Sequence, residues 1–343
     1  MDDSKIRNME EFASVSGISR PTVSKYFNDP ESVRKSTRAR IEAALEQYDY
    51  RPNIYAINQN RRSTKNVGIV VPYLADPFFA EIARHVETHV IGAGFRPILL
   101  SSHGDPGQEI GNLDSLRALR PAGVLMAPLG RASDRAMVEA FCEEVPTVLF
   151  DSNLEGVGEA FVGHDNRQAT ENIVKYLCRT GEPPVFFEMK TPANPNANRR
   201  RNAYLDVMRA HGHEPQVISI DGVGWEFEEI GFRGAQKALA AREFSTNTVL
   251  CSNDRLAIGF LSAAYETGLR IGVGAGCAMR VAGHDDHPFA RFTCPRLTTI
   301  SQDYTSIATK AAETLFGLIE SDARAASRET TLFDGKLILR SSA

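Results

Sequence analysis

Short apolar runs that recur between residues 67 and 285 constrain the fold more than any other feature. Each run is nearly continuous in apolar residues and is followed by a loop and, usually, a stretch of helical length. The runs are 67–72, 96–101, 122–128, 145–151, 183–189, 217–221, 247–253 and 280–285. Such runs are typical of strands in parallel sheets that helices cover on both faces. Because one small sheet cannot hold them all, we expect two Rossmann-like α/β lobes, with ligands at the carboxyl ends of the strands.

The residues before this region differ from it in charge. A chain of 343 residues is expected to form two or three domains. Residues 1–65 contain twelve lysines and arginines and nine acidic residues, a net charge of +3. The remaining residues contain 27 basic and 34 acidic residues, a net charge of −7. A mildly basic head on an acidic body is compatible with a head that binds nucleic acid.

The cysteines and the absence of long apolar segments indicate the compartment. The five cysteines are scattered and form no C-x-x-C pair, so we expect neither a disulfide framework nor a zinc site, and a reducing cytosol. The N-terminal stretch has no apolar core typical of a secretory signal, and no run is long enough to span a membrane. HDDH at 284–287 contains metal-binding residue types, but adjacent residues on one loop rarely form a closed site. We expect no cofactor, no metal, no membrane contact and a cytoplasmic location.

Residues 8–50 are predicted to form three short helices. Asn8 and Glu11 are placed as in a capping box at the start of the first helix, and Gly17 ends it. The second helix is the stretch GISRPTVSKYFN at 17–28. The apolar residues expected to face inward are Met9, Phe12, Ala13, Val23, Tyr26, Phe27, Ile41, Ala44, Leu45 and Tyr48. Three helices with a glycine turn between the first two describe a helix-turn-helix head.

A proline inside the second helix is unusual. If Ser19 is the N-cap, Pro21 occupies the second helical position, where the backbone N–H has no intrahelical partner in any case. Proline biases the residue before it away from the α region, so we expect the helix to begin one residue late, after Arg20.

Residues 9–53 resemble the head of LacI/GalR-type bacterial transcription repressors. The shared pattern is A-x-x-x-G-[VI]-S-x-x-T-V-S-[RK]-x-x-N, followed by T-R-x-R-I and Y-R-P-N. VGIVVPYLADPFFAEI at 67–82 is similar to the start of the effector-binding core of that family. Segments 162–166, 252–264 and 281–303 match later core segments. The resemblance therefore covers nearly the whole chain, in the order found in the family.

The resemblance implies an all-α helix-turn-helix head, a hinge and an α/β core of two Rossmann-like lobes, like periplasmic sugar-binding proteins. We place the head at 1–50, the hinge at 51–65 and the core at 66–343. The head-proximal lobe is predicted to comprise 66–163 and 292–325, and the distal lobe 164–291 and 326–343. The implied function is that of a homodimeric transcriptional repressor associated with the nucleoid. Its affinity for pseudo-palindromic operator DNA would be controlled by a small-molecule effector, a sugar or sugar acid. Inducer and corepressor remain alternatives.

The family pattern also assigns DNA-contacting residues, because the second helix of a helix-turn-helix enters the major groove. Arg20, Pro21 and Lys25 occupy its base-reading positions, and arginine or lysine can bond guanine O6 and N7. The phosphate-contacting or supporting positions hold Asn8, Ser19, Thr22, Ser24 and Asn28. Pro21 can only pack against an apolar edge such as a thymine methyl, so we expect it to leave base reading to Arg20 and Lys25.

The hinge departs from the family. Hinge residues assigned to DNA are Asn53, Tyr55, Ala56, Ile57 and Gln59. A leucine that wedges into the minor groove in the family is replaced by Gln59, which cannot act as an apolar wedge. Either Ile57 or Tyr55 takes its place, or this hinge bends DNA little.

The residues that the resemblance assigns to the effector are aromatic, acidic, amide and basic. They are Asp76, Phe78, Phe79, Asp165, Arg200, Trp225, Asn253 and Asp285. Aromatic faces can cover the C–H faces of a sugar while the polar groups pair with hydroxyls. Arg200 could also pair a carboxylate with two hydrogen bonds, which suits a sugar acid. Alternatively, the aromatic residues are plain core and Arg199–Arg201 is a solvated basic run.

Two other classes of protein share parts of this pattern. A periplasmic-type sugar-binding protein shares the core but not the helical head. A nicotinamide-dependent enzyme would carry G-x-G-x-x-G after its first strand, and GVGAG at 272–276 has the wrong spacing and place. The G-x-S-x-G, Walker A and H-E-x-x-H motifs are also missing from the sequence. We therefore expect a binding protein rather than an enzyme.

Overall fold

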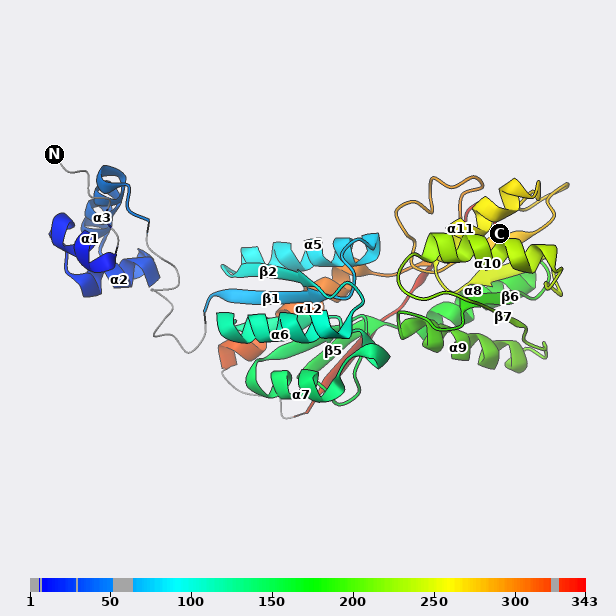
Figure 1. The fold of residues 1–343 in the computed structure, drawn as a ribbon, viewed down its shortest axis with the longest axis horizontal. Helices are drawn as coiled ribbons and strands as arrows, with labels where there is room; N and C mark the ends of the chain where they lie inside the picture. Colours follow the sequence, from blue (N-terminus) through cyan, green and yellow to red (C-terminus); the bar gives the residue numbers. More distant parts are fainter. Residues whose placement is uncertain (1–5, 7, 29, 52–63, 322–326) are drawn as a thin grey trace. The chain divides into compact units, whose positions relative to one another are not determined.

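The computed structural model describes residues 6, 8–28, 30–51, 64–321 and 327–343. The chain divides into two compact units, with the boundary between Thr64 and Lys65 (Figure 1). The first unit is the helical head and the second is the α/β core. This confirms the predicted fold class.

The head contains the three predicted helices, joined by a tight turn and a short 3₁₀ segment. They are α1 (Met9–Ser16), α2 (Arg20–Asn28), η1 (Pro30–Ser32) and α3 (Lys35–Tyr48). Asn8 caps α1: its Oδ1 accepts from the backbone N–H groups of Glu10 and Glu11 at 3.0 and 2.9 Å, and its Nδ2 donates to Glu11 Oε1 at 3.0 Å. Gly17 ends α1 with φ of 63°, a left-handed conformation that glycine adopts without strain.

The interior of the head is formed by the residues predicted to face inward. Phe12, Val23 and Ile41 are fully buried, one from each helix. Phe12 stacks on Tyr50, with 4.8 Å between ring centroids. This small apolar cluster fixes α2 against the other two helices and leaves its opposite face to solvent.

The start of α2 differs from the prediction. The helix begins at Arg20 rather than one residue later, and Pro21 is its second residue. The backbone N–H of Val23 donates to Ser19 O at 3.0 Å, so Ser19 accepts the first helical hydrogen bond. Ser19 Oγ also lies 2.8 Å from Thr22 Oγ1. The bias that proline imposes on the preceding residue is therefore overcome by the first helical turn, where proline loses no hydrogen bond.

The lobe of the core that begins at Asn66 is built on a parallel sheet of six strands in the order β11-β5-β4-β3-β1-β2. The strands are β1 (Asn66–Val71), β2 (Arg96–Ser101), β3 (Gly123–Met126), β4 (Thr147–Phe150), β5 (Ala160–His164) and β11 (Glu329–Phe333). The helical segments are α5 (Pro77–Gly92), α6 (Pro106–Leu119), η2 (Gly130–Ala132), α7 (Arg135–Glu144) and α12 (Tyr304–Ser321). We call this unit the proximal lobe.

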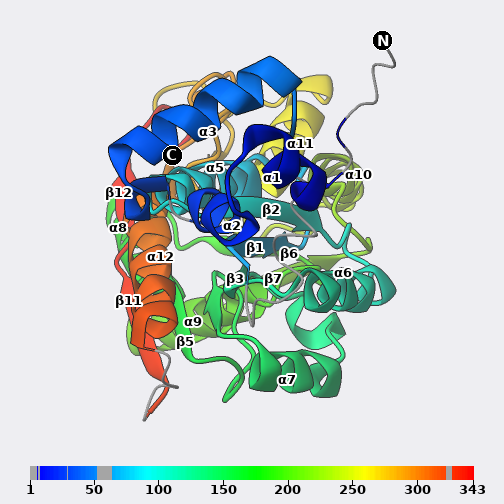
Figure 2. The ribbon, with the colours of Figure 1, turned by 90° about the vertical axis from the view of Figure 1, so that its left-hand side faces the viewer.

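Helices cover both faces of the proximal sheet, as the apolar runs predict. Along β1, Ile69 and Val71 belong to the cluster with α5 and α12, whereas Val70 belongs to the cluster with α6 and α7. In Figure 1, α5 and α6 lie on opposite sides of β1. Figure 2 shows α12 running beside β11, where Lys310 and Glu329 form an ion pair at 3.0 Å.

The distal lobe repeats this arrangement with a four-stranded parallel sheet in the order β7-β6-β8-β9. Its strands are β6 (Val185–Met189), β7 (Val217–Ile220), β8 (Thr248–Cys251) and β9 (Arg280–Ala282), and its helices are α8 (Asn166–Thr180), α9 (Asn196–Ala210), α10 (Phe227–Ala240) and α11 (Asp254–Glu266). Phe186 packs with α8 and α9, and Phe187 packs with α10 and α11. Strands β10 (Thr299–Ser301) and β12 (Lys336–Ile338) form a small antiparallel pair beside α8.

The predicted lobe boundaries need two corrections. Residues 329–333 were assigned to the distal lobe, but β11 pairs with β5 of the proximal sheet. Residues 292–303 were assigned to the proximal lobe, but Thr298 and Ser301 bridge to Ala282 and Asp285 of the distal lobe. The physical reason is that β10 and β11 are short, weakly patterned strands whose partners are distant in sequence. Neither they nor β5 appear among the apolar runs.

Candidate functional sites: an effector cavity and a DNA-reading helix

The core contains a cavity at the carboxyl ends of its strands. In both sheets the strand order reverses beside the first strand of the lobe, at β1 between β2 and β3 and at β6 between β7 and β8, which is where ligands bind in such folds. The lining residues come from both lobes. They are Asp76, Phe78, Phe79, Asp151, Asn194, Asn196, Ala197, Arg200, Trp225, Phe227, Ser252, Asn253, Asp254, Arg255, Asp285, His287 and Gln302.

All but one of the residues predicted for the effector line this cavity. The exception is Asp165, whose carboxylate caps α8 by accepting from the backbone N–H groups of Arg167 and Gln168, both at 3.0 Å. The cavity residues that the sequence did not single out include Asp151, Asn196 and Arg255. Each lies just beyond a strand or at the start of the helix that follows it. This position in the chain is the feature by which the sequence could have identified them as cavity residues.

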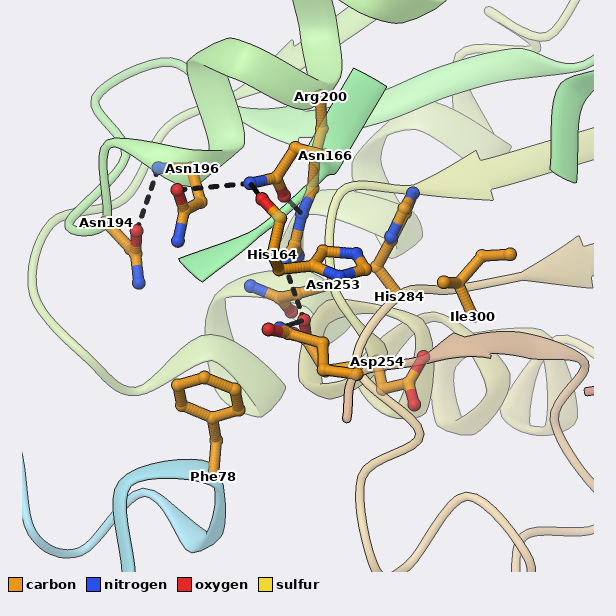
Figure 3. Close-up of polar contacts among 12 residues, drawn as sticks. Phe78, His164, Asn166, Asn194, Asn196, Arg200, Asn253, Asp254, His284 and Ile300 are labelled. Atoms are coloured by element: carbon orange, nitrogen blue, oxygen red, sulfur yellow. Dashed lines mark hydrogen bonds and ion pairs between the residues drawn. The ribbon is translucent and has the colours of Figure 1, made fainter. Parts of the chain in front are cut away.

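Arg200 organises the distal side of the cavity and is almost fully buried. Its Nε donates to Asn166 Oδ1 at 2.8 Å, its Nη1 to Ser252 O at 2.8 Å and its Nη2 to Asp285 Oδ1 at 2.6 Å. Figure 3 shows Arg200 beside Asn166 and Phe78 projecting from the start of α5. Every guanidinium nitrogen already donates to a protein group, so the bidentate carboxylate contact predicted for Arg200 would have to use the second N–H groups of Nη1 and Nη2.

Asp285 is held from three sides. Besides Arg200, Gln302 Nε2 donates to Asp285 Oδ1 at 2.7 Å, and the Tyr304 hydroxyl donates to its backbone carbonyl. The other members of HDDH also have separate roles. His284 lies 3.3 Å from the Thr170 hydroxyl through Nε2, and Asp286 pairs with Arg340 at 2.6 Å. Among the described residues, no cluster of three His, Cys, Asp or Glu could hold a metal ion.

Aromatic side chains line another side of the cavity. Trp225 stacks on Tyr73 of the proximal lobe, with centroids 5.5 Å apart and an interplanar angle of 14°. Phe79 and Phe227 meet the indole edge-on at 5.8 and 5.6 Å. Gly104 has φ of 74°, and a Cβ there would lie 2.5 Å from Trp225 Nε1, so only glycine leaves room for the indole.

Polar contacts also join the two lobes across the cavity. Arg255, from α11, donates to Glu228 Oε1 and Oε2 at 2.7 and 2.6 Å and reaches Asp76 Oδ2 of the proximal lobe at 3.1 Å. Asp151, which follows β4, accepts from Asn196 Nδ2 at 2.9 Å and from Asn194 Nδ2 at 3.3 Å, both in the distal lobe. These contacts must break when the lobes part.

The lobes are closed in this structure. The space open to water-sized molecules in the cavity is about 40 Å³. That is room for a few water molecules, whereas small-molecule sites span several hundred Å³. A sugar-sized ligand therefore has to part the lobes in order to enter.

Asp76→Asn is expected to favour the open form. Asparagine can still cap α5 through its Oδ1, as Asp76 does toward the Phe78 N–H at 3.0 Å, but it loses the charge that pairs with Arg255. A charge-assisted hydrogen bond contributes about 1.5–3 kcal/mol, so the ratio of closed to open molecules should fall at least about 10-fold. Small-angle X-ray scattering should then report a larger radius of gyration for the isolated core. Asp114→Asn, which removes an exposed carboxylate of the same lobe, is the control; equal scattering of both variants would contradict this role.

Asp151 makes the stability of the core depend on pH. Burial raises the pKa of its carboxyl to about 7 from an ordinary 3.8, with the Arg200 guanidinium opposing the rise. Between these values the folded state holds a proton that the unfolded chain releases, so this group lowers stability as pH rises from about 4 to 7. Asp151→Asn removes that loss. The difference in free energy of unfolding between Asp151→Asn and wild type should therefore grow by up to about 4 kcal/mol from about pH 4 to about pH 7. Urea titration at each pH measures it. A difference that is constant with pH would contradict the assignment.

The exposed face of α2 carries the predicted base-reading residues. Arg20, Pro21 and Lys25 are all exposed, and Pro21 and Lys25 are four residues apart and share a face of the helix. Ser19, Thr22 and Ser24 lie beside them, and Asn8 caps α1 rather than projecting freely. Asn28 ends α2, but its side chain lies outside the described part of the structure, as do Asn53, Tyr55, Ala56, Ile57 and Gln59.

Comparison with known proteins decides the family. Residues 8–53 match the bacterial regulatory proteins of the lacI family, and residues 176–343 match a periplasmic binding protein-like domain. The ribose operon repressor of Bacillus subtilis (strain 168) is 27% identical over 316 residues, covering 91% of each chain. The chain joins the DNA-binding domain of the lacI family to a periplasmic binding protein-like domain, and its homologues are LacI/GalR family regulators.

Solved structures of LacI/GalR proteins share the fold. The Lac repressor dimer bound to operator and the anti-inducer ONPF has a TM-score of 0.83 at 22% identity, with 98% of this chain and 99% of that chain covered. A LacI-family regulator from Enterococcus faecium with bound ribose has a TM-score of 0.68 at 18% identity, with 81% and 98% covered. In the part of the present chain that the structure describes, no helix is long and apolar enough to cross a membrane.

Proposed function

We propose that this LacI/GalR protein binds operator DNA as a homodimer and represses transcription, and that a sugar bound between the lobes of its core controls its affinity for DNA. The observation that carries the proposal is the cavity itself. Polar and aromatic side chains of both lobes converge on it, and contacts such as Arg255 to Asp76 form only when the lobes are closed. A ligand held there is therefore sensitive to the arrangement of the lobes.

The side chains around the cavity suit a sugar. Phe78, Phe79 and Trp225 offer apolar faces for the C–H groups of the ring. Asn253 uses its Oδ1 to cap α11 by accepting from the Leu256 N–H at 2.8 Å, which leaves its Nδ2 to donate to a hydroxyl. Asp285, fixed by Arg200, is a rigid acceptor for hydroxyl groups. Because its relatives are transcriptional regulators, we place the protein among regulators rather than enzymes, and in the cytoplasm, where bacterial DNA lies.

Control of DNA affinity follows from binding to two arrangements of the lobes. If the sugar and the operator favour different arrangements, each lowers the affinity for the other; if they favour the same one, each raises it. Dimerisation fits a head that reads one half-site of a pseudo-palindromic operator. The hinge at Gln59 would then determine how strongly the DNA is bent.

A ligand screen followed by DNA binding tests this function. Neutral, acidic and amino sugars are screened for an increase in the melting temperature of the full chain, since a ligand that binds the native state alone stabilises it. Operators are selected from a random duplex library, and their affinity is measured with and without each stabilising sugar. A sugar that changes operator affinity supports the proposal. Selection of no preferred duplex, or turnover of a sugar by the protein, would contradict it.

Pro21→Gln tests how α2 reads DNA. Glutamine can donate to and accept from a base edge where proline can only make apolar contacts. The substitution retains the fold, because the position is exposed and in the first helical turn. We expect a new preference at one base pair of each half-site, worth about 1–3 kcal/mol, when binding to an operator library is compared with wild type. An unchanged preference at every position would show that Pro21 does not face a base.

A further inference from the structure

The arginines of the cavity are fully engaged by protein groups. Arg200 gives its three nitrogens to Asn166, Ser252 and Asp285. Arg255 gives two nitrogens to Glu228 and the third to Asp76. Each guanidinium nitrogen thus already donates to a protein group, and each guanidinium already pairs with a carboxylate. The cations of the cavity therefore balance carboxylates of the protein.

The carboxylates are not all balanced in this way. Asp76 and Asp285 each pair with an arginine. Asp254 is fully buried and is held by the Thr299 hydroxyl at 2.6 Å and the His287 backbone N–H at 2.8 Å. Asp151 is 2% exposed and is contacted by the amides of Asn194 and Asn196; among the described residues no cation lies within ion-pair distance of it. Asp151 is thus a buried carboxylate beside the cavity without a positive partner.

Two further polar atoms of the lining have no partner in the described structure. Gln302 Oε1 is buried and unpaired, although its Nε2 bonds Asp285. His287 Nε2 is also buried and unpaired, and its Nδ1 accepts from the Phe289 N–H at 3.2 Å, so Nε2 carries the proton. Buried polar atoms in proteins are almost always hydrogen-bonded. These two atoms offer one acceptor and one donor to a ligand.

We propose that the effector carries a protonated amino group, as an amino sugar does, and that Asp151 binds this ammonium group. Gln302 and His287 then form hydrogen bonds with hydroxyl groups of the same sugar. The inference rests on the proposed function, since it names the class of sugar held between the lobes. An ammonium group supplies a positive partner that lets Asp151 bind as a carboxylate in a closed, water-poor cavity, where an unpaired charge is costly. A neutral sugar offers Asp151 no positive partner, and a sugar acid places a second carboxylate beside it.

Matched sugars test the charge directly. Glucose, galactose and mannose are compared with their 2-amino-2-deoxy, N-acetyl and uronic acid forms by thermal shift and then by calorimetry on the full chain. The amino group and the hydroxyl it replaces are nearly equal in size, so comparing each amino sugar with its parent isolates the effect of the charge. We expect at least one amino sugar to bind at least about 10-fold more tightly than its parent and its N-acetyl form, the usual gain from a charge-assisted hydrogen bond.

The variant Asp151→Asn should reduce the preference for the amino sugar over its parent by about 10- to 100-fold. Asp206→Asn removes an exposed carboxylate from the outside of α9 and should leave the preference unchanged. If Asp151→Asn does not fold, the matched sugars on the wild-type chain decide the question alone.

The possible failures are distinguishable. Tightest binding of a parent sugar or uronic acid that also changes operator affinity would overturn the amino-sugar inference and leave the proposed function standing. No binding by any class of sugar would contradict both. An amino-sugar preference that survives in Asp151→Asn would show that another group selects the charge.

Discussion

Arg200→Ala is expected to lower the free energy of unfolding of the core by about 3–5 kcal/mol and to abolish the response to the effector. The side chain is 5% exposed and bonds Asn166, Ser252 and Asp285. Its removal leaves Asp285 without its charged partner and Asn166 without a donor, and breaking a buried ion pair has a cost of this size. Urea unfolding of the core measures the stability, and the effector-induced change in melting temperature measures binding.

Arg209→Ala is the matched control for this experiment. Arg209 is on the same helix, α9, but is exposed and near its C-terminus. Its loss should change stability by no more than about 0.5 kcal/mol. Similar losses in the two variants would mean that Arg200 is an ordinary helical residue and that the network around Asp285 does not hold the distal side of the cavity together.

The second large effect is expected at the DNA. Arg20→Ala should weaken operator binding by about 5- to 150-fold and relax the preference at the base pair it reads, because one bidentate arginine–guanine contact contributes about 1–3 kcal/mol. The fold of the head should persist, since Arg20 is exposed and outside the cluster around Phe12. Fluorescence anisotropy on the selected operator and on single-base variants gives both quantities.

Arg40→Ala separates base reading from general charge. Arg40 is an exposed arginine on α3, away from the recognition helix in sequence. Its loss should weaken binding to all duplexes alike, by reducing electrostatic attraction, and should leave the base preference intact. If Arg20→Ala also weakens binding equally for all duplexes, Arg20 contacts phosphate rather than a base.

Local patterns in the sequence were sufficient to predict much of the fold. Asn8 with Glu11 and the glycine at 17 determine where α1 begins and ends, because capping depends on neighbouring residues alone. The apolar runs 67–72 and 183–189 predicted strands β1 and β6 in the same way, from neighbouring residues alone. The start of α2 was predicted one residue late, because the rule for residues that precede proline describes a bias and the helical turn at Ser19 outweighs it.

Features that depend on distant partners were harder to predict. Nothing local to 329–333 shows that this strand pairs with β5, which lies more than 150 residues earlier in the chain. Asp165 matched a family position, yet its carboxylate is occupied by the start of α8. Arg255 and Asp151 contact residues of the opposite lobe, and these contacts depend on the approach of the two lobes. No spacing in the sequence connects the residues that this approach brings together.

The central claim is that one ligand in the cavity changes the affinity of the head for operator DNA. The most direct test measures both halves of that coupling: operator affinity with and without the stabilising sugar, and sugar affinity with and without operator. Both measurements should give the same factor, about 5-fold or more, because coupling free energy is reciprocal. Sugar binding with equal affinity to free and operator-bound protein would contradict it.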